Sequence, residues 1–312
     1  MSDVIIVGAG LAGAAAAIVL ARGERSVTLL EKTIGPKPKV CGEFLSRSAL
    51  DTLATLNISA SGPSGLGGVP LSHFRLSAGD AATRMPLGFE AVSLSRQVLD
   101  EEMLQHAADA GATVVRGAAV TGIVRSGDGY LVDAGSQHSA SHLFVASGKS
   151  EVRNMRRGPG LHDNMVGLKR YARLPPGRTP DPTIDIVLFP GGYCGIQPVE
   201  GQRLNVCLAV AARALKEVGG PGLVFELVRR ASQEAATLLT DTTWDGPSLA
   251  VGRVPYGFIR TRTDGPFFLG DQAAVIPSFC GEGMGLALRS GVMAAEAHLA
   301  GKSAAAYQRE FA

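Results

Sequence analysis

The stretch VIIVGAGLAGAAAAIVLARG, residues 4–23, decides the fold of this 312-residue chain. It opens with four β-branched apolar residues, which is typical of a central parallel strand covered on both faces. A glycine cluster follows, and the alanine-rich run after it predicts a helix that stops near Gly23. Residues 26–30 form a second apolar run that ends at Glu31. These segments together predict one β-α-β unit of about thirty residues.

The glycines of this unit have the spacing Gly8-x-Gly10-x-x-Gly13. The first permits a tight turn, the second lets the backbone approach a diphosphate, and the third lets helix and strand pack closely. Free N–H groups at the helix start attract the diphosphate, and Glu31 would accept hydrogen bonds from both ribose hydroxyls. The pattern therefore predicts a dinucleotide-binding site. Its expected cofactor contacts are Gly8, Gly10, Leu11, Ala12, Gly13, Glu31 and Lys32.

Composition excludes several classes of protein. The chain is 46% hydrophobic and 19% charged, which allows a large buried core, and its net charge of +2 is too small to favour nucleic acid. Four cysteines without a C-x-x-C pair and six histidines without metal-ligand spacing favour reduced thiols, no metal and a cytoplasmic location. The arginine pairs at 156–157 and 229–230 are interpreted as solvated surface.

No charge interrupts residues 4–21, a length that approaches a membrane span. The segment nevertheless divides into a strand, a glycine turn and a helix, so no transmembrane segment is expected. Downstream, the pattern predicts helices over 46–56 and 95–110, a loop over 59–70, short strands over 113–115, 119–124, 130–132 and 143–146, and a terminal helix over 304–311.

The middle of the chain changes character. Residues 183–189, 193–197 and 203–210 alternate like an antiparallel meander with Gly-Gly and Glu-Gly turns, and residues 223–239 predict one helix. This section is the natural candidate for a substrate domain inserted into the nucleotide-binding one.

A second glycine-rich segment lies near the C-terminus. Residues 267–274 read FFLGDQAA, and CGEGMGLA follows at 280–287. Both resemble the glutathione-reductase-type flavoproteins, in the branch of aromatic-ring hydroxylases and geranylgeranyl reductases. In that family the aspartate bonds a ribityl hydroxyl of FAD, and the glycine run opens a helix aimed at the N1–C2=O edge of the flavin. The resemblance implies FAD contacts at Gly270, Asp271, Pro277, Gly281, Gly283, Met284 and Gly285.

The resemblance also implies the fold class and its domains. We expect an α/β fold in which a Rossmann-like FAD-binding domain carries an inserted antiparallel-sheet substrate domain. The FAD-binding domain would comprise residues 1–70, 90–156 and 252–312, and the substrate domain residues 71–89 and 157–251.

Two internal motifs extend the resemblance. SLSRQVLD at 93–100 resembles the R-x-x-L-D helix start, which implies that Arg96 reaches the FAD phosphates or the flavin edge. LFVASGKSEVR at 143–153 resembles the hydroxylases' D-G-x-x-S-x-V-R motif and implies an FAD contact at Gly148. In hydroxylases this motif also positions NADPH, but Ser147 replaces its aspartate here. The electron donor therefore stays open between NADPH or NADH and a reductase or ferredoxin-type protein.

Three residues are candidates for catalysis. VCGEFLS at 40–46 lies where the reductase branch carries a C-G-G-like loop, so Cys41 is either beside flavin or substrate or a small buried residue, and Glu43 is a candidate acid. FPGGYCGIQP at 189–198 resembles the G-Y-x-W-x-F-P strand of geranylgeranyl reductases, with Gly195 in place of the tryptophan. Tyr193 would line the substrate cavity or pack in the sheet.

The leading hypothesis is an FAD-dependent oxidoreductase acting on an apolar or aromatic small molecule, by reducing a double bond or by hydroxylation. Both reactions need a largely apolar cavity, for which Phe189, Ile196 and Leu208 are the expected lining. The paired tryptophans of flavin halogenases are absent, which argues against halogenation. The alternatives are a non-catalytic flavin-carrying or electron-relay protein and an NAD-dependent dehydrogenase.

Overall fold

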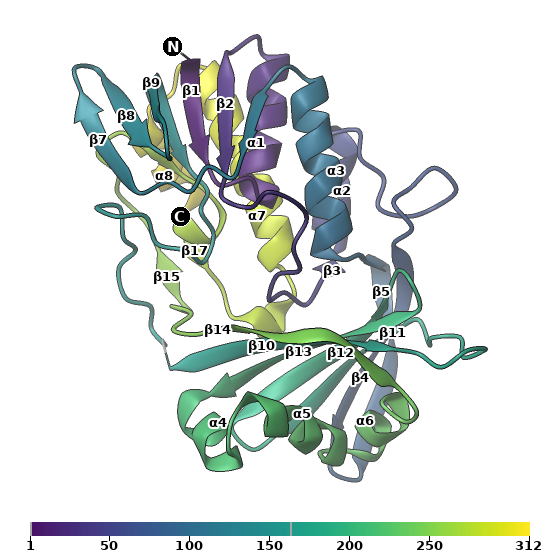
Figure 1. Ribbon diagram of the computed structural model, residues 1–312. Coiled ribbons are helices and arrows are strands. Elements are labelled where there is room, and N and C mark those ends of the chain that lie inside the picture. Colours follow the sequence, from purple (N-terminus) through teal and green to yellow (C-terminus); the bar gives the residue numbers. More distant parts are fainter. Residues whose placement is uncertain (1, 163) are drawn as a thin grey trace.

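The computed structural model describes residues 2–162 and 164–312. It contains two large β-sheets, which belong to two halves of the molecule stacked on one another (Figure 1). Both chain termini lie in the half built on the first sheet. No helix in the described ranges is long and apolar enough to cross a bilayer.

The first sheet confirms the β-α-β unit predicted from residues 4–31. Its strand order is β6-β2-β1-β9-β8-β7, and β16 also pairs with β9. β6, β2, β1, β9 and β16 are mutually parallel, so their carboxyl ends lie at one edge. The strands are β1 (Ser2–Val7), β2 (Val27–Glu31), β6 (Thr113–Arg116), β7 (Gly122–Ser126), β8 (Gly129–Asp133), β9 (Gln137–Val145) and β16 (Phe267–Phe268).

Helices cover one face of this sheet, and the β7–β8 hairpin belongs to the core on the other. Ile6 and Leu29 pack into the helical side, whereas Ile5 and Leu30 pack with the hairpin side, as expected from strand alternation. Burial on both faces explains why the strands read as continuous apolar runs. The helices are α1 (Leu11–Arg22), α2 (Arg47–Thr55), α3 (Arg96–Asp109), α7 (Gly283–Leu299) and α8 (Ala304–Phe311).

The second sheet has the order β14-β10-β13-β12-β11-β4-β5-β3. The predicted meander is confirmed as β11, β12 and β13, and β11 also pairs in parallel with β4. β10, β14 and the long β4–β5 hairpin were not predicted. The strands are β3 (Phe44–Leu45), β4 (Val69–Ala78), β5 (Ala81–Ser93), β10 (Met165–Arg173), β11 (Thr183–Phe189), β12 (Gly192–Val199), β13 (Arg203–Ala211) and β14 (Thr243–Val251).

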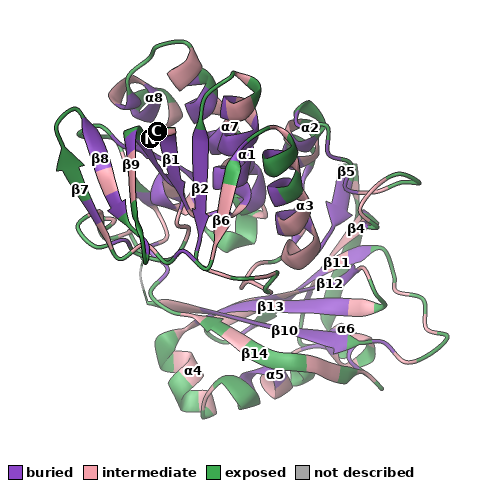
Figure 2. Cartoon of the chain, turned by 45° about the horizontal axis from the view of Figure 1, so that its top comes forward, coloured by how far each residue is buried: buried purple, intermediate pink, exposed green. Residues whose placement is uncertain are grey.

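Three helices cover the outer face of the second sheet: α4 (Ala212–Val218), α5 (Pro221–Arg230) and α6 (Gln233–Leu238). Their solvent side is exposed while the strands beneath are mostly buried (Figure 2). The single helix predicted over 223–239 is wrong, because the chain breaks at Ser232, whose Oγ accepts the Ala235 N–H and caps a new helix.

The expected cavity lining is also wrong. Phe189, Ile196 and Leu208 pack against Val224 and Phe225 of α5 on the outer face. Because side chains alternate along a strand, their neighbours Leu188, Gly195 and Cys207 lie on the opposite face, which we call the inner face. The inner face looks toward the first half. Besides these strands, β15 (Phe258–Ile259) and β17 (Ala274–Val275) form a two-stranded sheet.

Candidate active site

The N-terminal and C-terminal glycine motifs meet at the carboxyl edge of the first sheet. Leu269 N donates to Val145 O (2.9 Å), and Ala146 N donates to Val7 O (2.8 Å), which sets the ends of β16, β9 and β1 side by side. A Cβ added to Gly270 would lie 3.2 Å from Ala12 Cβ on α1. Two stretches about 260 positions apart in the chain therefore border the same edge.

The glycine turn is shaped to admit a ligand. Gly8 has a φ of +98°, and a Cβ there would lie 2.5 Å from Ala146 O. A Cβ at Gly13 would overlap Gly8 O. At Gly10, by contrast, the nearest atoms to an added Cβ are cationic: Arg96 Nη2 at 3.5 Å and Lys39 Nζ at 3.8 Å. The exposed backbone at Gly10 and the start of α1 thus form a cradle that fits a diphosphate.

Asp100 holds both cations in place. Arg96 donates to its two oxygens at 2.7 and 3.1 Å, and Lys39 Nζ lies 2.6 Å from Oδ2. Burial alone would raise the pKa of Asp100, but the charges of Arg96 and Lys39 outweigh it and keep that pKa below its ordinary value. Lys39 was missed at the sequence level, because it lies in a proline-rich loop without a recognisable motif.

Glu31 lies at the end of β2 next to the turn. Its carboxylate accepts the Ala9 N–H (3.0 Å) and both the N–H and the hydroxyl of Thr33 (2.9 Å each). Burial would raise the pKa of Glu31, but the hydrogen bonds from Thr33 and Ala9 reverse the shift and lower it. Lys32, which was expected to contact the cofactor, instead donates a hydrogen bond to Ser150 Oγ in the loop after β9 (2.8 Å).

Asp271 is surrounded by basic groups that the sequence did not reveal. Lys149 Nζ donates to Asp271 Oδ2 at 3.2 Å. Arg157 donates to the backbone oxygens of Asp271 (3.2 Å) and Lys149 (3.0 Å) and pairs with Glu151. Arg157 was expected to be solvated, but its side chain is only 4% exposed. Through these hydrogen bonds Arg157 connects the loop after β9, which contains Gly148, to residues 270–271.

Glu43 is completely buried between the two halves. Its carboxylate lies 2.5 Å from Lys169 Nζ and accepts the Tyr171 hydroxyl at 2.7 Å. It also accepts the Arg96 N–H at the start of α3 (2.8 Å). Since every approach to the carboxylate is occupied and no part of it is exposed, this geometry supports a positioning role for Glu43 rather than the acid role expected from sequence.

The backbone of residues 40–43, which we call the Cys41 loop, is anchored on the inner face. Asn205 donates to the carbonyl oxygens of Cys41 (3.1 Å) and Gly42 (2.7 Å). Gln197 donates to Glu43 O at 3.0 Å. The Cys41 thiol is half-buried and accepts the Glu43 N–H at 3.4 Å. Strands β10, β12 and β13 therefore fix this loop against the first half.

Tyr193 marks a second contact between the halves. Its hydroxyl bonds Ser278 Oγ, which also lies 2.8 Å from the Tyr256 hydroxyl. The Tyr193 ring packs edge-on against Phe279, with centroids 5.1 Å apart. Burial raises the pKa of Tyr193 well above its ordinary value, so its phenol remains protonated.

The glycine run that begins α7 serves different purposes along its length. Gly281 has a φ of +72°, and Gly283 has no heavy atom within 4 Å of an added Cβ. The side chain of Met284 is buried in the helical core, and Gly285 lies where a Cβ would crowd Ser48 of α2. Gly283 therefore leaves its backbone uncovered, while Met284 and Gly285 pack the start of α7 into the core; the expected FAD contacts at Pro277, Gly281 and Gly283 stay predictions.

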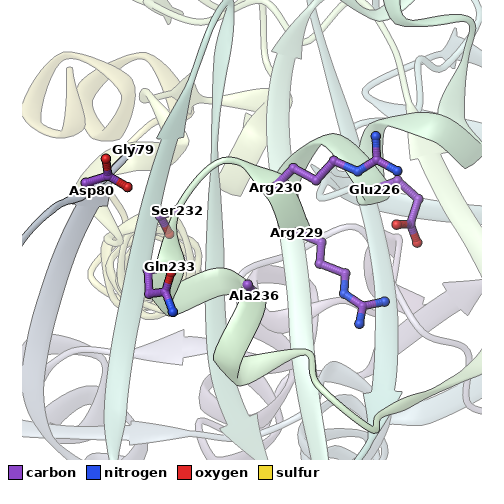
Figure 3. A pocket seen from close by; sticks show the side chains of 8 residues that line it. All are labelled: Gly79, Asp80, Glu226, Arg229, Arg230, Ser232, Gln233 and Ala236. Carbon is purple, nitrogen blue, oxygen red and sulfur yellow. The ribbon is translucent and has the colours of Figure 1, made fainter.

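A hollow of about 500 Å³ lies on the opposite side of the second sheet. Arg229 and Arg230 line it together with Asp80 and Glu226 (Figure 3). It borders α5 and α6 on the outer face, so it is separate from the glycine turn and the Cys41 loop.

The fold places a glycine turn suited to a diphosphate beside an accessory eight-stranded sheet. A family model described as FAD dependent oxidoreductase matches residues 3–150. Menaquinone reductase of Mycolicibacterium smegmatis is 28% identical, and the alignment covers 95% of this chain and 76% of the relative. Digeranylgeranylglycerophospholipid reductase 1 of Methanopyrus kandleri is 27% identical, with 94% and 79% covered.

Solved structures agree on the fold. A myxobacterial chondrochloren halogenase superposes with a TM-score of 0.83 at 20% identity, covering 99% of this chain and 78% of that one. These matches identify the protein as an FAD-dependent oxidoreductase. This assignment sets aside the NAD-dependent dehydrogenase and the non-catalytic flavin carrier considered from the sequence.

Proposed function

We propose that the protein reduces a carbon–carbon double bond in an elongated apolar substrate of the isoprenoid type. Two relatives that match nearly the whole chain are named for menaquinone and for a digeranylgeranyl lipid, both of which carry isoprenoid chains. The substrate domain would be the second sheet with its helices, expected over residues 71–89 and 157–251.

The observation that carries this proposal is an apolar track across the inner face. Ile184 pairs with Phe74, which pairs with Met85, so one row of apolar side chains crosses β11, β4 and β5. Ile186 and Leu76 form a parallel row. Met85 is 48% exposed and Leu188 is 37% exposed. Accessible apolar side chains in continuous rows mark a binding surface, and the two spacings between these three strands span about 10 Å.

The cofactor contacts expected from sequence fit this arrangement. The cradle at Gly10, with Arg96 and Lys39, would hold the diphosphate, Glu31 the ribose and Asp271 the ribityl chain. Bound and reduced, FAD would supply a hydride to one carbon of the double bond. The other carbon takes a proton, for which we propose the Tyr193 phenol, and solvent restores that proton through Ser278.

The loop that follows β9 bears on the source of the electrons. Ser147 replaces the acid of the hydroxylase motif, and its hydroxyl donates to Ser150 O (2.8 Å) within its own loop. We therefore favour a reductase or ferredoxin-type donor over direct reduction by NADPH or NADH. Anaerobic bleaching of the flavin by NADPH or NADH, at a rate that matches turnover, would contradict this choice.

The test of the reaction uses FAD-loaded protein reduced with dithionite under anaerobic conditions. Menaquinone and a digeranylgeranyl lipid are added, and the products are analysed by mass spectrometry. Reduction adds two hydrogen atoms to the substrate, and Tyr193→Phe should slow this gain while leaving FAD bound. Substrate returned unchanged without oxygen, together with a gain of one oxygen atom in air, would establish hydroxylation instead.

A further inference from the structure

Gly195 is an unusual glycine because neither its backbone nor its packing requires it. Five glycines lie in strands of the second sheet: Gly88, Gly167, Gly192, Gly195 and Gly246. Gly88 and Gly246 have positive φ, whereas added Cβ atoms at Gly167 and Gly192 would crowd their neighbours. Gly195 has no positive φ, and its added Cβ would meet nothing nearer than 3.7 Å.

A glycine in the interior of a strand weakens the strand, and it often marks a point where a ligand approaches the backbone closely. Gly195 lies on β12, inside the eight-stranded sheet rather than at its edge, yet it remains partly accessible to solvent. Its cross-strand neighbours are Cys207 and Ile186. Burial raises the pKa of Cys207 to about 12, so its thiol is neutral.

Gly195 also lies midway between the two contacts that join the halves. Two residues before it, Tyr193 bonds Ser278 in the segment that leads to α7. Two residues after it, Gln197 bonds Glu43 O in the Cys41 loop. Four residues of strand span about 13 Å, so the two contacts frame an opening above Gly195. The segments that frame it are the Cys41 loop and the glycine run, both of which carry expected FAD contacts or neighbours.

We propose that Gly195 is a specificity-determining residue, whose missing side chain makes room for the reacting segment of the substrate. This inference rests on the proposed function for the class of substrate. The segment that fits is uncharged, because Ile186 and the Cys207 thiol flank it and the charge of Lys169 is paired with Glu43; its double bond follows from the proposed function. The rest of the chain would follow Ile186 and Leu76 toward β5.

The test compares FAD-loaded wild type with Gly195→Val and Gly195→Phe. Gly122→Phe is the matched control, since Gly122 lies in strand β7 of the other sheet with open space around an added Cβ. Changes in the flavin absorption spectrum report binding of geranylgeraniol, and fluorescence reports binding of the uncharged apolar dye Nile red. Thermal melting checks the fold.

Gly195→Phe should weaken geranylgeraniol binding at least tenfold, and Gly195→Val less, with FAD content and melting temperature retained. If wild type binds the dye but not geranylgeraniol, loss of dye binding in the Gly195 variants would keep the role of Gly195 and reject the isoprenoid substrate. Binding within twofold of wild type in both Gly195 variants would overturn the inference, as would a wild type that binds neither probe. If Gly195→Phe does not fold, the binding affinity of Gly195→Val alone tests the inference.

Discussion

The Lys149 ammonium lies 3.2 Å from the Asp271 carboxylate, and this ion pair bridges the loops that follow β9 and β16. The carboxylate raises the pKa of Lys149, so the lysine remains charged. Both residues border the edge where the glycine turn lies. Because the pair joins the two loops, we expect both loops to act together when FAD binds.

Asp271→Ala should weaken FAD binding by about 1.5–3 kcal/mol, on the scale of a lost hydrogen bond to a charged group. The expected result is roughly a tenfold to hundredfold rise in the dissociation constant, measured by the fluorescence of released FAD. Asp264→Ala, at an exposed site, serves as the control and should bind FAD normally. Unchanged affinity in Asp271→Ala would remove this residue from the site.

Gly10→Val should abolish FAD uptake, because the new side chain would fill the cradle in front of Arg96 and Lys39. The apoprotein should still melt cooperatively, since an added Cβ contacts no backbone atom nearer than these side chains. Absorbance of the purified protein between 350 and 500 nm, roughly the flavin range, measures uptake. A variant that is as yellow as wild type would place the diphosphate elsewhere.

Lys169→Met should destabilise the protein by about 3–5 kcal/mol, because it leaves Glu43 buried without its cation. The double variant Glu43→Gln with Lys169→Met should recover much of that loss, since no charge stays buried. Chemical denaturation of wild type, both single variants and the double variant gives the coupling energy between the two residues. Equal losses in the single and double variants would mean that the pair contributes through shape alone.

Asp185 should make stability depend on pH. Burial raises its pKa to about 7 despite Arg75 Nη1 at 3.3 Å, whereas an unfolded aspartate titrates near pH 4, roughly. The folded protein therefore holds a proton that the unfolded chain releases, and this stabilisation is complete below about pH 4 and lost as the pH rises to about 7. Asp185→Asn should flatten this part of the unfolding profile. If the unfolding free energy of the variant depended on pH as steeply as that of wild type, another group would be the cause of the pH dependence.

Local patterns were sufficient for the first half of the molecule. The strand at 4–7, the glycine turn and Glu31 follow one another within thirty residues, and their arrangement depends on neighbours in the chain. The second half was predicted only where strands alternate in short hairpins. β10 was missed because Lys169, Arg170 and Arg173 make it read as polar, and the burial of Lys169 is explained only by Glu43 from a distant loop.

The same limit applies to the site. The glycine motifs and Arg96 carry recognisable spacing, so their cofactor roles could be expected from sequence and await the tests above. Lys39, Lys149 and Arg157 have no motif, and their positions depend on loops that converge only after folding. Phe189, Ile196 and Leu208 were assigned to the wrong face because alternation fixes which residues share a side but not which side is the inner one.

Strand β3, only Phe44–Leu45, has a consequence for how the molecule opens. It follows directly on the Cys41 loop, yet it pairs with β5 as the last strand of the second sheet. A short segment of the nucleotide-binding half therefore forms the edge strand of the second sheet and links the two halves through backbone hydrogen bonds. Separating the two halves would break the backbone hydrogen bonds between β3 and β5. We therefore expect a long ligand to enter along the inner face from the side of β5, without a hinged opening of the two halves.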